Sequence, residues 1–428
     1  MRRARCHSAI LLLTVIPLTA IVALLAATPV QSAERLSITI SAGKHDRKNV
    51  PTRTSIVLPN ELADTATASL VADDGRVLAG QLTVPGLLAD YPDPPEGKVV
   101  RELHFILPSL AAGKSTELEV EVPGRVGDRL PQFTWTESDG KSCDLTHNGK
   151  PVLRYMHEPL DESSPERRGE TYKPYHHVFD PTGSRLLTKG PGGLFPHHRG
   201  LFYGFNRITY GDGKKADTWH CNNGEYESHE EFLRTEAGPV LGRHLVAIDW
   251  HGQDGDVFAR EEREMTVYRA GDRWLVDFAS RLKSTGGTVR LDGDPQHAGF
   301  QFRASQEVPD STKDQTYYIR PDGRDKPGNY RNWPDDKRQV NLPWHAMSIV
   351  LGGERYTISY LDHPENPKEA RYSERDYGRF GSYFEYDLEE ARPLEVQYHV
   401  GVQEGEMTVE EAEALSNDFV EPAGVKVR

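Results

Sequence analysis

The sequence has little of what marks several large classes of protein. Its 428 residues include only three cysteines, no lysine-rich or arginine-rich stripe, and a net charge of -14. Three cysteines cannot build the disulfide framework of a small secreted domain. A chain without a clustered basic surface is not expected to bind nucleic acid. Phosphate-binding glycine loops, a Gly-x-Ser-x-Gly elbow, a His-Glu-x-x-His helix and a Cys-x-x-Cys pair are also missing.

Long apolar runs are missing too, with one exception at the N-terminus. Arginines within residues 2–5 precede the uncharged segment 9–27, and small residues lead to a plausible cleavage site before Glu34. This order predicts a signal peptide over residues 1–33 and export to the periplasm or the outside of the cell. The run exceeds the usual length of about 7 to 15 residues, so an uncleaved membrane anchor is the alternative. We expect no other membrane contact.

Two cysteines follow the predicted cleavage site. Cys143 and Cys221 would then lie in an oxidising compartment. One disulfide between them and two separate buried thiols are both compatible with the sequence.

Short patterns typical of β-strands dominate the next hundred residues. Residues 117–122 alternate glutamate with leucine or valine, which indicates a strand with one solvent face and one core face. Similar short runs occur at 55–58, 77–84 and 101–107, separated by Gly, Pro and Asp. The spacing predicts that residues 34–128 form a small β-sandwich domain.

The strand patterns continue from residue 133 with longer loops between them. The clearest are residues 240–250, 264–268, 274–278, 356–361 and 394–400. Only one helix is expected: Thr408 is placed as its N-cap, and Glu411 completes a capping box. We therefore predict an all-β protein in which residues 133–428 form a large antiparallel two-sheet sandwich with one short C-terminal helix.

Histidine is the unusual feature of the composition, with 17 in the chain. One window holds His176, His177, His197, His198, His220 and His229. Adjacent residues on a strand point to opposite faces, so each pair is expected to offer one imidazole to a given site. With Asp217 nearby, such a cluster suits either a metal ion or general acid–base chemistry. No strong metal motif is present, and we expect neither a resident metal nor another cofactor.

The most specific string in the chain is FPHHRGLFYG, at residues 195–204. Together with the segments 175–183, 217–219, 297–303, 361–367 and 375–378, it resembles the PmoA-like family of secreted bacterial proteins, which carries the label methane oxygenase. The resemblance covers roughly residues 150–402. It implies a large β-sandwich similar to that of galactose mutarotases.

The resemblance also implies roles for particular residues. In mutarotase-like enzymes, a histidine protonates the ring oxygen while a carboxylate removes the proton of the anomeric hydroxyl. The candidate catalytic residues are His197, His198, His297 and Glu264. A clear counterpart of the mutarotase glutamate motif is missing, so Glu264 and Glu385 are only candidates for that carboxylate. The candidate substrate-binding residues are Arg199, Trp219, Gln301, Arg303, Asp362, His363 and Arg375.

Three functions remain open at this point. The first is a carbohydrate-active protein that performs acid–base chemistry on a sugar or glycoside, as an isomerase, lyase or hydrolase. The second is a non-catalytic polysaccharide-binding module that uses the loop 314–341, which carries Tyr330 and Trp333. The third is a metal-dependent oxidoreductase. A carbohydrate is the expected ligand, and the sequence says nothing of the oligomeric state.

Overall fold

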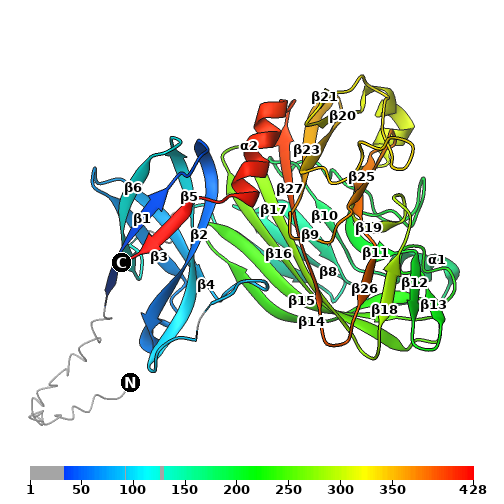
Figure 1. Cartoon of the computed structure of the whole chain (residues 1–428), viewed down its shortest axis with the longest axis horizontal. Helices are drawn as coiled ribbons and strands as arrows, with labels where there is room; N and C mark the ends of the chain where they lie inside the picture. Colours follow the sequence, from blue (N-terminus) through cyan, green and yellow to red (C-terminus); the bar gives the residue numbers. More distant parts are fainter. Residues whose placement is uncertain (1–32, 92, 126–129) are drawn as a thin grey trace, which may run out of the picture. The chain divides into compact units, whose positions relative to one another are not determined.

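β-Strands dominate the chain, as the sequence predicts (Figure 1). The computed structural model describes residues 33–91, 93–125 and 130–428. The predicted signal peptide lies outside the described residues except for Ala33. Within the described residues, the α-helices are α1 (Pro165–Thr171) and α2 (Val409–Val420). No helix in this part of the chain is long and apolar enough to cross a membrane.

The N-terminal region forms one seven-stranded sheet that curls around an apolar core. The strand order is β2-β5-β4-β3-β6-β1-β28. The strands are β1 (Glu34–Ser41), β2 (Arg47–Pro59), β3 (Thr67–Ala72), β4 (Val77–Thr83), β5 (Lys98–Leu110), β6 (Ser115–Val122) and β28 (Gly424–Val427). On β6, Leu118 and Val120 are buried while Glu117 and Glu119 are exposed. The predicted alternation is confirmed for residues 117–120 and ends at Glu121, which is buried.

The last strand of the chain belongs to this first sheet. In β28, Val425 pairs with Ile40 of β1 in antiparallel register. The sequence analysis assigns every residue after 133 to the second domain, so the structure differs from that boundary at the C-terminus. Residues 34–428 form one compact unit. A pairing between strands nearly 400 residues apart has no local sequence signal.

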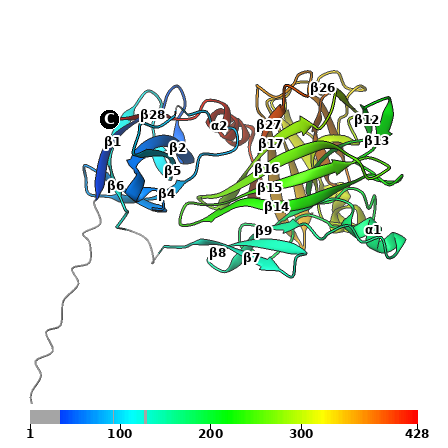
Figure 2. The ribbon, with the colours of Figure 1, turned by 90° about the horizontal axis from the view of Figure 1, so that it is seen from below.

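Two larger sheets pack face to face in the second region (Figure 2). One has eight strands in the order β24-β25-β19-β11-β10-β9-β8-β7, and the other has nine in the order β14-β15-β16-β17-β27-β23-β22-β20-β21. Phe278 of the second sheet stacks on Phe300 of the first with 4.2 Å between ring centroids. Both belong to one extensive apolar core. The predicted large antiparallel sandwich is confirmed.

The eight-stranded sheet consists of β7 (Phe133–Ser138), β8 (Ser142–His147), β9 (Lys150–Met156), β10 (Tyr175–Val178), β11 (Leu201–Phe205), β19 (Ala298–Arg303), β24 (Arg371–Arg375) and β25 (Arg379–Tyr383). The nine-stranded sheet consists of β14 (Tyr226–Ala237), β15 (Leu241–His251), β16 (Val257–Ala270), β17 (Arg273–Ser284), β20 (Tyr317–Arg320), β21 (Gly323–Arg324), β22 (Trp344–Leu351), β23 (Glu354–Asp362) and β27 (Leu394–Glu404). A four-stranded sheet is formed by β12 (Arg207–Tyr210), β13 (Lys214–Ala216), β18 (Val289–Asp292) and β26 (Tyr386–Leu388).

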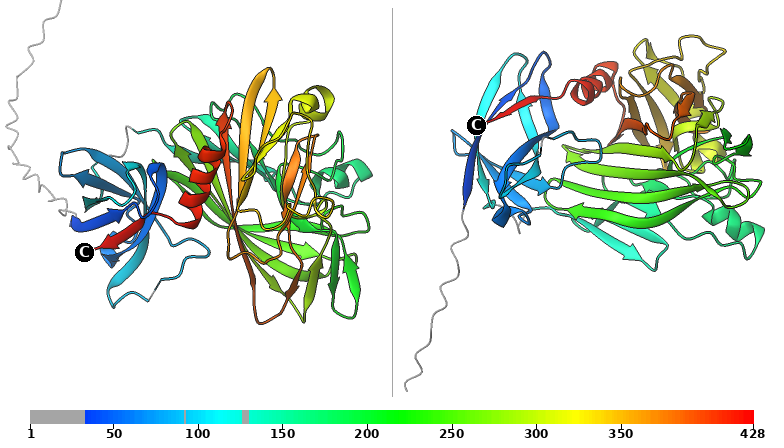
Figure 3. Two further views of the ribbon diagram at one scale, coloured as in Figure 1. Left: turned by 45° about the horizontal axis from the view of Figure 1, so that its top comes forward. Right: turned by 60° about the horizontal axis from the view of Figure 1, so that its bottom comes forward.

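Helix α2 lies beside both the seven-stranded and the nine-stranded sheet (Figure 3). Its predicted capping box is present: the Thr408 hydroxyl accepts from the Glu411 amide at 3.1 Å, and the Glu411 carboxylate accepts from the Thr408 amide at 2.9 Å. Leu415 shares an apolar cluster with Trp344 of β22 and with Ile106 of β5. Helix α2 therefore packs against both the seven-stranded sheet and the nine-stranded sheet.

Helix α1 is a second α-helix, in addition to the single helix expected from the sequence. Ser164 caps the helix, because its side chain accepts from the Arg167 amide, and Pro165 occupies the first turn. Serine followed by proline is a known start signal. The helix has only seven residues and buries only Thr171, so it lacks a clear apolar stripe.

The two described cysteines are separate buried thiols. Cys143 lies on β8, and Cys221 lies in a turn where its thiol donates to the Thr218 carbonyl at 3.4 Å. The disulfide alternative is not realised in this structure.

Candidate functional site

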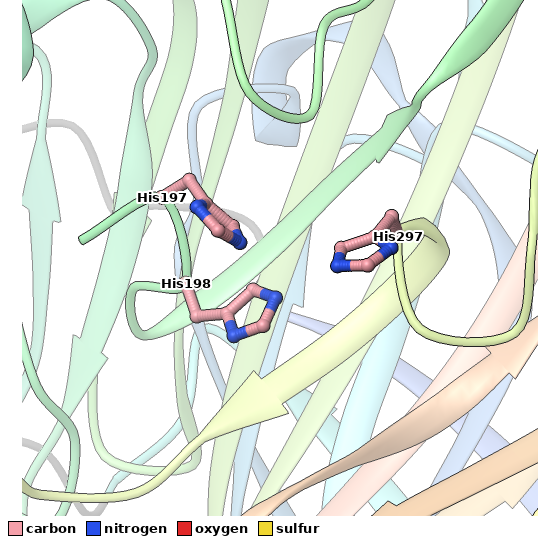
Figure 4. A group of neighbouring side chains, drawn as sticks. All are labelled: His197, His198 and His297. Carbon is pink, nitrogen blue, oxygen red and sulfur yellow. The ribbon is translucent and has the colours of Figure 1, made fainter. Parts of the chain in front are cut away.

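Four histidine side chains from three parts of the chain form what we call the outer histidine cluster: His197, His198, His220 and His297. The His197 and His198 rings are 4.3 Å apart between centroids, and His220 lies 4.5 Å from His197 and 4.8 Å from His297. His297 stacks on His198 at 5.8 Å. Figure 4 shows His197, His198 and His297 facing one another. The structure thus places His297 beside three histidines of the window, which are His197, His198 and His220.

The loop before β11 has the backbone shape that this arrangement needs. Gly200 has a φ of +50°, and a Cβ at this position would come within 2.1 Å of the His176 carbonyl oxygen. Only glycine fits at this position without moving the His176 backbone. Phe195, at the other end of the turn, has a φ of +55°, which is uncommon for a non-glycine residue. The left-handed backbone conformations of Phe195 and Gly200 turn the chain at both ends of the segment that carries His197 and His198.

Two of the imidazoles are oriented by an aspartate three residues earlier. Asp217 accepts from His220 Nδ1 at 2.8 Å, and Asp294 accepts from His297 Nδ1 at 3.0 Å. Each aspartate also accepts from a backbone amide in its own turn, that of Trp219 or Gln296. Donation from Nδ1 leaves Nε2 with its lone pair. Asp294 was not among the predicted site residues, although the repeated Asp-x-x-His spacing at 217–220 and 294–297 is a sequence signal for it.

His197 and His198 lack such partners. Burial, followed by nearby cationic groups, lowers the pKa of His197 to about 2 and that of His198 well below its usual value. His198 is 1% exposed, and among the described residues neither of its ring nitrogens has a hydrogen-bond partner; Nε2 of His197 also lacks one there. An imidazole held neutral by burial can accept a hydrogen bond or bind a metal ion, but it is a poor general acid and a weak base. The implied acid role of His198 therefore does not fit its surroundings.

Two buried lysines hold the turns that carry the cluster. The Lys189 ammonium donates to the carbonyls of Leu194 and Phe195 at 3.1 and 3.2 Å. The Lys173 ammonium donates to the Thr218 carbonyl at 3.3 Å and also to that of Trp219. Burial lowers the pKa of Lys189 to about 7 and that of Lys173 to about 8. Neither lysine was predicted as a site residue.

The rim of the cluster is apolar and open. Leu194 and Phe195 are 39% and 40% exposed, although large hydrophobic side chains are usually buried. The Tyr377 ring lies 5.0 Å from that of Phe195 and 6.3 Å from that of His198. An exposed aromatic surface therefore borders the imidazoles.

The predicted substrate-binding residues near the cluster are mostly occupied by internal contacts. Arg199 is fully buried, donates to the carbonyls of Gly169 and Glu170, and stacks on Tyr172 at 4.3 Å. Arg303 donates to the carbonyls of Tyr377 and Leu194. These two arginines support the walls of the site.

Gln301 and Trp219 lie under the cluster. The Gln301 amide donates to the Ala298 carbonyl, and its oxygen accepts from Arg379 at 2.8 Å. Trp219 is fully buried, with its ring 5.7 Å from that of His198. It packs against the cluster from within the protein.

The remaining predicted residues lie elsewhere. Glu264, on β16, accepts from the Leu87 amide at 3.1 Å and pairs with Arg234 at 3.0 Å. It lines a cleft of about 1210 Å³, as His363 does. Asp362 binds the side chains of Asn366 and Lys368. The structure does not bring these residues to the outer histidine cluster.

Arg375 and Glu385 are also engaged in other contacts. Arg375 donates to the Glu374 carbonyl and faces the Tyr330 ring at 5.6 Å. Glu385 pairs with Arg371 and Arg290. Neither Glu264 nor Glu385 is therefore placed to act as the catalytic carboxylate that the mutarotase resemblance implies.

The aromatic residues of loop 314–341 mainly anchor it. Tyr317 and Tyr318 are fully buried, and Trp333 lies between Arg371 at 4.4 Å and Lys337 at 5.3 Å. Tyr330, at 45%, is the large exposed aromatic of the loop. A single exposed ring offers little aromatic surface for stacking against a polysaccharide.

Two further histidines of the window, His176 and His229, belong to an inner histidine cluster between the two large sheets, whereas His177 contacts Thr188 at 2.9 Å. The inner histidine cluster comprises His157, His176, His229 and His244 around Tyr155. His176 stacks on Tyr155 at 4.6 Å, and its Nε2 lies 2.9 Å from that of His244. His229 Nδ1 lies 3.2 Å from the Tyr155 hydroxyl. Packed aromatic rings fill the space between these imidazoles.

Two groups of described residues have the geometry to hold a metal ion. One is His197, His198 and His297, and the other is Glu230, Asp249 and His251. In the second group, both His251 nitrogens are occupied, by the Ser228 hydroxyl at 2.8 Å and the Gly255 carbonyl at 3.1 Å. Asp249 also pairs with Arg260 at 3.4 Å. The first group is the one with free ligand nitrogens.

Comparisons with known proteins give a family and two distant structures. A family model described as "Family of unknown function (DUF6807)" matches residues 142–417. No curated protein matches the sequence. A glycosyl hydrolase family 38 protein from Enterococcus faecalis is similar at a TM-score of 0.43 and 8% identity, over 92% of this chain and 47% of that one. The α-galactosidase AgaA of family GH36 from Geobacillus stearothermophilus is similar at a TM-score of 0.30 and 10% identity, over 65% and 41% of the two chains. The chain thus spans less than half the length of either protein.

Proposed function

The chain belongs to the DUF6807 family, whose function is unknown, and we propose that it is an exported carbohydrate-active protein that acts on a sugar or glycoside at the outer histidine cluster. The observation that carries the proposal is the combination of unpartnered neutral imidazoles with an exposed aromatic rim. The reaction class, whether isomerase, lyase or hydrolase, is left to experiment. The PmoA-like resemblance and the predicted signal peptide support the proposal of an exported protein.

The rim suits the apolar face of a sugar ring. Phe195 and Tyr377 offer aromatic surface at the edge of the cluster. Binding sites for small ligands commonly combine such surfaces with a few well-placed polar groups. A pyranose lying against Phe195 would direct its hydroxyls toward His197 and His198. The neutral nitrogens of these imidazoles would accept hydrogen bonds from those hydroxyls.

His297 is the best-placed group for proton transfer. Asp294 holds its Nδ1–H, so Nε2 is free to accept a proton, and the carboxylate stabilises the imidazolium that forms. Asp217 prepares His220 in the same way. The two carboxylate-oriented imidazoles have ring centroids 4.8 Å apart. When one enters the step neutral and the other enters it protonated at Nε2, the first takes one proton from the sugar and the second returns one. In this proposal, His297 and His220 together take the roles that the mutarotase resemblance assigns to a histidine and a glutamate.

A ligand and turnover screen tests the proposal. The purified protein is titrated calorimetrically with monosaccharides and soluble glycans, and each hit is followed by NMR for anomeric exchange, elimination or hydrolysis. We expect at least one hit whose affinity falls tenfold or more in Phe195→Ala. His297→Gln should abolish turnover and retain binding. The control is Tyr330→Ala, in the loop 314–341.

The outcomes separate the hypotheses. If Tyr330→Ala weakens binding and Phe195→Ala does not, the polysaccharide-binding module with loop 314–341 replaces our proposal. If binding depends on Phe195 but no condition gives turnover, the protein is a binder at the histidine site. If no sugar binds at millimolar concentration, the proposed ligand class is wrong. Sequencing the N-terminus of the exported protein, expected to begin at Glu34, tests the localisation.

A further inference from the structure

The ligand atoms of His197, His198 and His297 lie close enough together to share one ion. One nitrogen from each of the three imidazoles lies within 4.8 Å of the other two. Ligands that bind one zinc ion at about 2.0–2.1 Å in a tetrahedron are roughly 3.3–3.5 Å apart. Small side-chain rotations therefore suffice to close the group around an ion. Figure 4 shows the ring nitrogens directed into the common space.

The hydrogen-bond partners of the three imidazoles suit a cation. Metal-bound histidine must be neutral at the ligating nitrogen. Asp294 orients His297 through Nδ1 in the carboxylate–histidine arrangement that is common behind metal ligands. His198, at 1% exposure, has no protein partner at either nitrogen, which is costly unless something else binds there.

We propose that His197, His198 and His297 bind one divalent transition-metal ion, with zinc as the best match to three neutral nitrogen ligands, and that Asp294 is the positioning residue of the site. Three protein ligands leave a fourth position open, as in catalytic rather than structural zinc sites. This inference rests on the proposed function and deepens it by changing one role: with the ion bound, Nε2 of His297 is a metal ligand, so an anion in the open position, rather than a free His297, would accept the proton of the sugar. It differs from the expectation of no resident metal that the sequence analysis reached.

Nearby charges bear on what fills the fourth position. Lys173, Lys189, Arg303 and Arg379 are the cationic groups that act on His197 or His198, whereas Asp217 and Asp294 are the carboxylates hydrogen-bonded to the cluster. A cation placed among cationic groups gains from an anionic fourth ligand. Hydroxide or a deprotonated sugar hydroxyl is such a ligand. The electrostatics therefore favour a metal-bound oxyanion over a fourth neutral ligand.

Metal retention tests the site directly. The purified protein is stripped with a chelator, loaded with Zn²⁺ or Co²⁺, passed through a desalting column and analysed for metal. We expect one ion per chain, and a visible Co²⁺ spectrum of the intensity typical of four-coordinate sites. His198→Ala and His297→Ala should lose the ion and the spectrum. His251→Ala, in the second group of possible ligands, is the matched control and should retain both.

Asp294→Asn keeps the shape of the turn while removing the negative charge behind His297. We expect it to weaken Co²⁺ affinity by about 10- to 100-fold, with unchanged circular dichroism. This variant remains informative if His198→Ala fails to fold. The proposal is overturned if the wild-type protein retains neither ion, or if loss of His251 removes the metal while loss of His198 does not.

Failure of the metal site and failure of the proposed function give different results. A protein that binds sugar without retaining Zn²⁺ or Co²⁺ contradicts the metal site only. A protein that retains one ion per chain but binds no sugar contradicts the carbohydrate proposal only. A redox-active metal found after purification, with zinc excluded by competition, would contradict zinc as the preferred ion.

Discussion

The outer and inner histidine clusters are built from the same residue type and partly from the same stretch of sequence, yet their surroundings differ. In the inner cluster, Tyr155 stacks on His157 and His176, and further aromatic rings surround His229 and His244. In the outer cluster, His198 has no polar partner, and the rim is open. The comparison teaches that the packing around an imidazole, rather than histidine density, separates a core histidine from a candidate ligand.

The two clusters should respond in opposite ways to substitution. Inner imidazoles fill volume in a close-packed core, so their removal costs stability. In the outer cluster, His197 and His198 contribute buried nitrogens without partners among the described residues, so their removal costs function and little stability.

Tyr155→Ala should have the largest effect. Tyr155 is fully buried and contacts all four inner imidazoles. The loss of its ring is expected to reduce the free energy of unfolding by about 3–5 kcal/mol, as for other large core aromatics. Urea denaturation followed by tryptophan fluorescence measures the change. A loss below 1 kcal/mol would mean that the inner cluster is not the packed core described above.

Acid should destabilise the protein through its buried histidines, to which the inner cluster contributes together with His197 and His198. Burial lowers the pKa of His244 to about 3 and that of His176 well below its usual value. The unfolded chain binds more protons than the folded one below a pH of about 6.5, so stability is complete above that value and is lost as the pH falls. We expect a loss of about 2–4 kcal/mol between pH 7 and pH 5 in denaturant titrations.

Glu227 must be taken into account in that measurement. Burial raises its pKa to about 8. Its contribution has the opposite sign: it is present below the unfolded pKa and is lost as the pH rises through about 8. Glu227→Gln should therefore steepen the net rise in stability from pH 5 to 7, and His244→Gln should reduce it. A flat profile in both variants would contradict the proposed origin of the acid sensitivity.

His198→Gln should have the smallest effect on stability. The side chain is buried without partners, so we expect the free energy of unfolding of the metal-free protein to change by less than about 1 kcal/mol. The same urea titration measures it beside Tyr155→Ala. A loss of 3 kcal/mol or more would show that His198 is a structural residue like those of the inner cluster.

Much of the fold follows from local patterns. The alternation in β6 and β27 places Val120 and Val400 in cores and Glu119 and Glu395 at the surface. The capping box at Thr408 marks the start of α2. These features depend on neighbours within a few residues, so the sequence shows them directly.

The candidate site was predicted in part. His197, His198 and His297 were selected from their motifs, and the structure brings them together. Arg199 was selected from the same string, but its guanidinium points to the carbonyls of Gly169 and Glu170. Glu264 was selected from the mutarotase resemblance, and it lines the cleft of about 1210 Å³ instead of the outer histidine cluster. Residue type indicated suitable chemistry, but the direction of each side chain depended on contacts with remote segments.

The sequence by itself determined the β-rich architecture, the alternation of buried and exposed residues and the start of the last helix, because these depend on short-range periodicity and backbone hydrogen bonding. Only the tertiary structure decided that β28 returns to β1, and that His176 joins His244 while His198 joins His297. The physical reason is that such contacts form between segments far apart in the chain. The packing of whole sheets selects them, and no local pattern records that choice.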